Sequence, residues 1–77
     1  MLESIKINIA SVPDRESLVA ELFVKHEMWA EINQENGQPV LEVYPRGNGQ
    51  PWILPLEDVL QALTTAKKKL VDVEEEG

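Results

Sequence analysis

Apolar residues in the last third of the chain recur every three or four positions, which is typical of one face of an amphipathic helix. Pro55 suits the first turn of such a helix, and acidic residues near its start with lysines near its end complement the helix dipole. The spacing predicts a helix over residues 55–71, followed by an acidic disordered tail over residues 72–77. The apolar stripe consists of Leu56, Val59, Leu60, Leu63, Ala66 and Leu70.

The middle of the chain alternates between apolar and polar residues on both sides of Asn36-Gly37, a dipeptide that favours a type I′ hairpin turn. The turn and the alternation indicate the same strand register independently. In the register that the turn sets, the apolar residues of both strands lie on one face of the sheet. The pairs that this register sets up are Glu35 with Gln38, Ile32 with Leu41, Ala30 with Val43, and Trp29 with Tyr44.

Two upstream segments, residues 5–9 and residues 18–25, alternate in the same way and are predicted to be strands. Turns at residues 12–15 and 25–27 would connect them to each other and to the hairpin. Residues 14–30 also fit a helix. We prefer the strand interpretation, since a lone two-stranded ribbon is poorly stable.

Downstream of the hairpin, residues 45–51 contain two glycines and read as a loop, and Trp52-Ile53-Leu54 is expected to form a short last strand. The sequence therefore predicts a single α+β domain over residues 1–71. Its architecture is an antiparallel β-meander of four to five strands with one C-terminal helix packed on its inner face.

The opposite, outer face of this predicted sheet would combine carboxylates with aromatic rings. Like charges opposite each other destabilise a sheet unless a cation meets them, and aromatic rings add apolar area and cation–π contacts. We therefore expect the outer face to bind a basic protein or a second copy of the chain. The alternative is that the aromatics pack as cross-strand pairs while Lys6 or Lys25 neutralises the acids. The candidate partner-binding residues are Glu21, Phe23, Trp29, Glu31, Glu42, Tyr44 and Trp52.

The net charge of −7, from 14 acidic and 7 basic residues, supports a basic protein partner and disfavours nucleic acid and anionic membranes. The absence of cysteine excludes disulfides and thiolate metal sites. The sequence shows no apolar run long enough to span a bilayer and no signal-peptide pattern, so a cytoplasmic location is expected.

The sequence offers little that resembles catalytic chemistry. His26 is the one histidine and falls in a predicted turn, and Gly47-Asn48-Gly49 lacks the lysine and the strand–loop–helix context of a phosphate-binding loop. Paired carboxylates need a cleft for acid–base catalysis, which an open sheet face does not provide. We therefore predict a non-enzymatic protein with no catalytic residue, no cofactor and no metal ligand.

Three runs, residues 29–32, 43–46 and 51–57, resemble small uncharacterised bacterial proteins, some of which are similar to immunity proteins. The resemblance covers roughly residues 15–70. Immunity proteins neutralise toxins in contact-dependent or polymorphic toxin systems, so the resemblance implies a protein that binds and blocks a toxin domain. An acidic inhibitor would suit a nuclease toxin, whose substrate site is basic.

Overall fold

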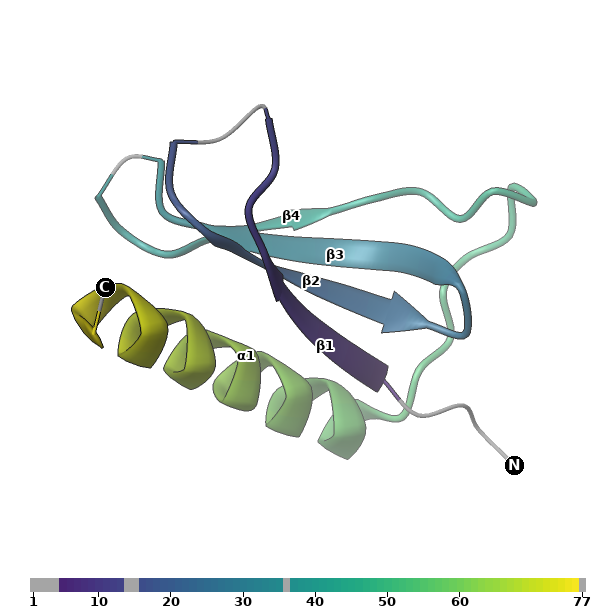
Figure 1. The fold of residues 1–77 in the computed structure, drawn as a ribbon. Helices are drawn as coiled ribbons and strands as arrows, with labels where there is room; N and C mark the ends of the chain where they lie inside the picture. Colours follow the sequence, from purple (N-terminus) through teal and green to yellow (C-terminus); the bar gives the residue numbers. More distant parts are fainter. Residues whose placement is uncertain (1–4, 14–15, 36, 77) are drawn as a thin grey trace.

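The structure, a computed structural model of the 77-residue chain, describes residues 5–13, 16–35 and 37–76, the last four of them as backbone only (Figure 1). A four-stranded antiparallel sheet has the strand order β1-β2-β3-β4, and one helix follows it. The predicted α+β meander with a C-terminal helix is therefore confirmed. Its elements are β1 (Ile5–Ala10), β2 (Val19–Val24), β3 (Glu27–Asn33), β4 (Val40–Val43) and α1 (Leu56–Glu76).

The competition between strand and helix upstream of the hairpin is settled in favour of strand. β2 pairs with both β1 and β3, and a tight turn at Lys25-His26, with Lys25 at a φ of 58°, links β2 to β3. The predicted turn over residues 12–15 falls partly on 14–15, which lie outside the described residues.

The register between β3 and β4 is the predicted one, with Ile32 opposite Leu41 and Ala30 opposite Val43. Asn36 of the predicted turn lies outside the described residues. Its neighbour Gly37 has a φ of 80° and donates its backbone N–H to the carbonyl of Gln34 at 3.0 Å. Glycine adopts this left-handed backbone without the steric cost that a β-carbon would bring.

A β-bulge in β3 changes which side chains reach the core. Leu22 pairs with Ala30, but the next residue, Phe23, pairs with Met28, so Trp29 is an extra residue in β3. Trp29 is only 5% exposed and belongs to the core cluster. The predicted location of Trp29 on the outer face is therefore wrong. The placement of Met28 on the inner face is also wrong, since Met28 lies opposite Phe23.

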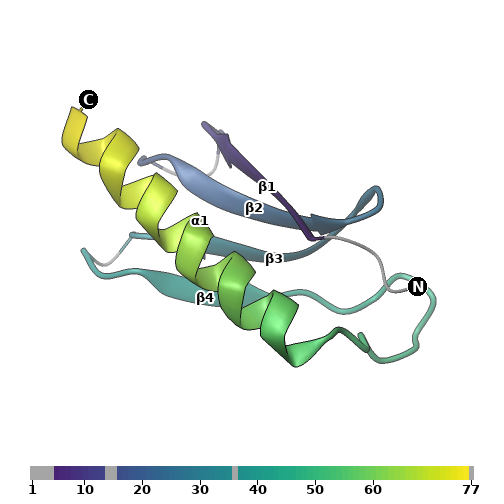
Figure 2. The ribbon, with the colours of Figure 1, turned by 90° about the horizontal axis from the view of Figure 1, so that it is seen from below.

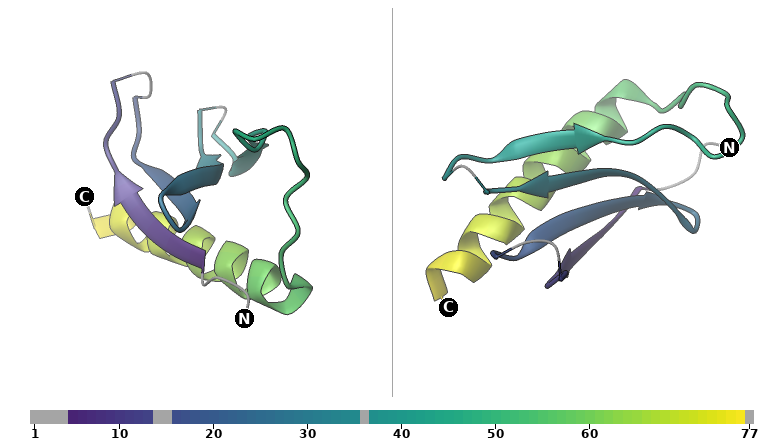
Figure 3. Two further views of the ribbon diagram at one scale, coloured as in Figure 1. Left: turned by 90° about the vertical axis from the view of Figure 1, so that its right-hand side faces the viewer. Right: turned by 90° about the horizontal axis from the view of Figure 1, so that it is seen from above.

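The helix covers the sheet unevenly. It crosses below the sheet on a diagonal (Figure 2) and packs mainly against β1 and β2, while β4 lies farther away (Figure 3). Small side chains at Ala62 and Ala66 let it approach the sheet closely, because both are buried against it. The core cluster consists of Ala20, Leu22, Val24, Trp29, Ala30, Ile32, Ala62, Ala66 and Leu70.

Both ends of the helical region differ from the prediction. Residues 51–55, which include the expected last strand, have no regular secondary structure. The helix continues through Glu76 rather than ending near residue 71, and so takes in most of the segment assigned to the acidic tail. Glutamate is a good helix former, which is consistent with this extension. The three lysines at 67–69 consequently lie inside the helix and not in its last turn.

Candidate protein-binding face

A row of polar side chains crosses all four strands on the face of the sheet that points away from α1. Glu21 pairs with Glu31, Glu31 pairs with Glu42, and Asn8 on β1 pairs with Glu21. The structure thus brings the three predicted glutamates together in adjacent register. We call these four residues the acidic row. Asn8 was not among the predicted site residues.

Side-chain amides hold the carboxylates of the acidic row in place. The Asn8 Nδ2 donates to Glu21 Oε1 at 3.1 Å, and the Asn33 Nδ2 donates to Glu31 Oε2 at 3.1 Å and also to Glu42 Oε2. The Asn33 Oδ1 accepts the backbone N–H of Glu35 at 3.3 Å, which directs the amide NH₂ toward the two glutamates. Asn33 therefore connects the carboxylate of Glu31 on β3 to that of Glu42 on β4.

Burial makes these hydrogen bonds important for the acidic row. Glu31 is 5% exposed and Asn33 is 3% exposed, although both lie on the face that the helix does not cover. Buried carboxylates require hydrogen-bond donors, and Asn33 supplies one. An asparagine amide carries no charge, so these hydrogen bonds position the carboxylates without neutralising them. The alternative in which Lys6 or Lys25 neutralises the glutamates stays a prediction.

Sequence reasoning missed Asn8 and Asn33 although a signal for both was available. Asn33 follows Glu31 by two positions in β3, and Asn8 follows Lys6 by two positions in β1. Residues two apart on a strand share a face. The same alternation that identified the glutamates therefore places both amides beside them.

The predicted aromatics divide between the core, the outer face and a loop. Phe23 lies opposite Met28 on the outer face, and both side chains are half-buried. Tyr44 follows β4, is half-buried and donates its backbone N–H to the Trp29 carbonyl at 2.9 Å. Trp52 is half-buried and packs against the core from the loop. Only Phe23 and Tyr44 thus remain as predicted aromatic neighbours of the acidic row.

The loop after β4 holds a cation against an aromatic ring. The Cζ of Arg46 lies 5.1 Å from the centroid of the Trp52 ring, within the range of a cation–π interaction. The Trp52 Nε1 donates to the Tyr44 carbonyl at 3.1 Å, and the backbone N–H of Gly47 donates to Glu27 Oε2 at 2.6 Å. These bonds fix the loop to the end of the sheet. The Arg46 side of the Trp52 ring is therefore already occupied.

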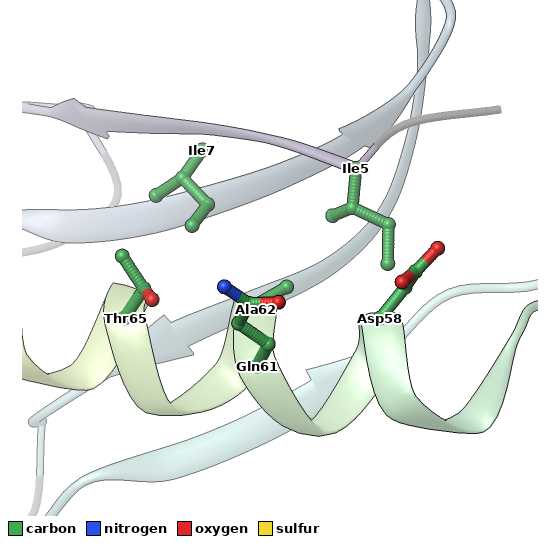
Figure 4. Close-up of a pocket in the computed structure, with 6 residues that line it drawn as sticks. All are labelled: Ile5, Ile7, Asp58, Gln61, Ala62 and Thr65. Atoms are coloured by element: carbon green, nitrogen blue, oxygen red, sulfur yellow. The ribbon is translucent and has the colours of Figure 1, made fainter.

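A separate pocket of about 290 Å³ lies between β1 and α1 (Figure 4). Ile5 and Ile7 point into it from the strand, and the helix contributes one carboxylate, one amide and one hydroxyl. The pocket therefore has one apolar wall and one polar wall. Its helix residues are Asp58, Gln61, Ala62 and Thr65.

Comparison of the chain with protein-family models, with curated proteins and with solved structures gives no match. Among the described residues, no three histidine, aspartate or glutamate side chains come together in a way that could hold a metal ion. In the same part of the chain, no helix is both long and apolar enough to cross a membrane.

Proposed function

We propose that this chain is a non-enzymatic protein-binding module that presents its acidic row to a basic partner. The observation that carries the proposal is the adjacent register of Glu21, Glu31 and Glu42, whose hydrogen bonds from Asn8 and Asn33 position the carboxylates without cancelling their charge. An arginine or lysine of a partner placed over this row would relieve the repulsion between the carboxylates and gain charge-assisted hydrogen bonds.

The proposed contact surface follows from the exposure of each side chain. Glu21 and Glu42 are half-buried and flank the buried Glu31, so they are the carboxylates that a partner reaches first. Phe23 and Tyr44 add apolar and aromatic area beside them, which is typical of interface hot spots. Trp52 lies outside this surface, because it packs against the core from the loop. Trp29 supports this surface from inside the core.

The partner class that we propose is the basic substrate site of a toxin domain, which the chain would block as an immunity-type inhibitor in the cytoplasm. A net charge of −7 on 77 residues favours fast association with such a site. The same attraction weakens with ionic strength, because screening is stronger when the Debye length is shorter.

Affinity capture from the native host, with Glu42→Lys compared against Asp72→Lys, tests the proposal. Each substitution replaces a carboxylate by a lysine, but Asp72 is exposed on α1, on the other side of the sheet. We expect Glu42→Lys to lose a captured basic protein that both wild type and Asp72→Lys retain. Equal recovery of the same partner with all three proteins would contradict the proposal. Circular dichroism establishes that each variant is folded.

A further inference from the structure

The inner face of the sheet is covered over β3, where Ala30 and Ile32 are buried, but its apolar side chains are exposed on β4. A strand spacing of about 4.8 Å makes a four-stranded sheet about 19 Å wide, whereas a helix with its side chains is about 10 Å across. The single helix packs mainly against β1 and β2. Leu41 and Val43 on the inner side of β4 are consequently 43% and 60% exposed.

One flank of α1 continues this uncovered apolar surface. A groove of about 160 Å³ runs between β4 and the helix, and Leu41, Leu63 and Lys67 are among its lining residues. Leu56 and Leu60 lie on the same helix flank as Leu63, at seven and three positions before it, and are 68% and 50% exposed. The opposite flank, which includes Gln61, faces β1 instead.

We propose that this groove, extended along Leu56, Leu60 and Val43, binds an amphipathic helix of a partner protein. The helix would lie antiparallel to α1 and complete a two-helix layer under the sheet. A helix packed beside α1, with its axis about 8–10 Å away, would cover β4 together with the exposed leucines on this flank of α1. This site lies on the opposite face from the acidic row, so the inference does not rest on the proposed function.

Charges at the two ends of the groove specify the chemistry of the occupant. Glu57 stands in the first turn of α1, at one end, and Lys67 lines the groove near the other end. An antiparallel helix with an acidic first turn and a basic last turn would place opposite charges beside both. These charges also complement the occupant's own dipole, so a stable amphipathic helix naturally carries them.

A second copy of this chain suits the groove less well than a different protein. The α1 helix of a second copy already uses Ala62, Ala66 and Leu70 to cover its own sheet and could offer only its flank. Each copy also carries a net charge of −7, which opposes self-association. A partner helix with a free apolar face has neither disadvantage.

The test uses the full chain and two stapled peptides of about 18 residues, or about five helical turns. Both peptides carry leucines at three- and four-residue spacing. One has glutamates in its first turn and lysines in its last turn, and the other has these charges exchanged. Methyl NMR titrations compare wild type with Leu60→Lys and Gln61→Lys, which place the same new charge on adjacent residues of opposite helix flanks.

We expect the first peptide to shift the methyl signals of Leu41, Val43 and Leu63. We also expect Leu60→Lys to weaken its binding about tenfold or more, and Gln61→Lys to bind like wild type. The charge-exchanged peptide should bind more weakly to wild type. The proposal is overturned if neither peptide binds, if both variants bind equally, or if the exchanged peptide binds as tightly. It is also overturned if light scattering finds a dimer of the chain that Leu60→Lys dissociates.

Discussion

On both faces of this sheet, the exposure of some side chains is the opposite of what their polarity would suggest. The outer face is polar and has no helix over it, yet Glu31 and Asn33 are nearly inaccessible there and bond to each other. The inner face is apolar and has a helix, yet Val43 is 60% exposed. The polarity of a residue alone therefore does not predict its burial in this small domain.

Replacement of Trp29 by alanine is expected to have the largest effect on stability. Trp29 is 5% exposed in the core, so Trp29→Ala should lower the free energy of unfolding by about 3–5 kcal/mol, as for other buried aromatics. Urea unfolding measures this loss, and Trp52→Ala, at a half-buried tryptophan, is the control and should lose less. If Trp29→Ala cost no more than Trp52→Ala, Trp29 would lie on the surface after all.

Removal of the amide donors of the acidic row should lower the free energy of unfolding by an intermediate amount. Asn33→Ala removes the donor that Glu31 and Glu42 share, and a buried acceptor left without its donor costs about 1–3 kcal/mol. Asn8→Ala removes the corresponding bond to Glu21 at an exposed site and should cost less than about 0.5 kcal/mol. Equal losses in urea unfolding would show that Asn33 is no more buried in solution than Asn8.

Replacement of Val43 on the inner face should have the smallest effect on stability, in contrast to replacement of a buried valine on the same face. Val43→Ala, at a side chain that is 60% exposed, should change the free energy of unfolding by less than about 0.5 kcal/mol. Val24→Ala, at a side chain that is 9% exposed on the same face, should cost on the order of 2 kcal/mol. A substantial loss for Val43→Ala would mean that something already covers the groove, such as a second copy of the chain.

The sequence was sufficient for the features that depend on strict alternation. Asn36-Gly37 and the apolar parity gave the register of β3 and β4, and the register of the three glutamates followed from it. Alternation fails where the backbone adds a residue, which is why Trp29 and Met28 were assigned to the wrong faces. A bulge depends on how β2 and β3 pair in three dimensions, and no residue type in the segment indicates its position.

Two further features depend on tertiary arrangement. The burial of Glu31 beside Asn33 does not follow from alternation, and the open groove follows from the helix lying over β1 and β2 instead of the sheet's centre. The helix stripe correctly predicted that Val59, Leu63, Ala66 and Leu70 pack on the core, but it missed Ala62. It did not predict that Leu56 and Leu60 would stay exposed, since periodicity does not give the lateral position of a helix.

The most direct test of the acidic row as a binding site is an amide NMR titration of the isotope-labelled chain with the captured basic partner. The account predicts chemical-shift changes centred on Glu21, Glu42 and Tyr44, with little change around Asp58 and Gln61 on the far side of the sheet. Changes centred on Asp58 and Gln61, with the amides of the acidic row unmoved, would contradict it.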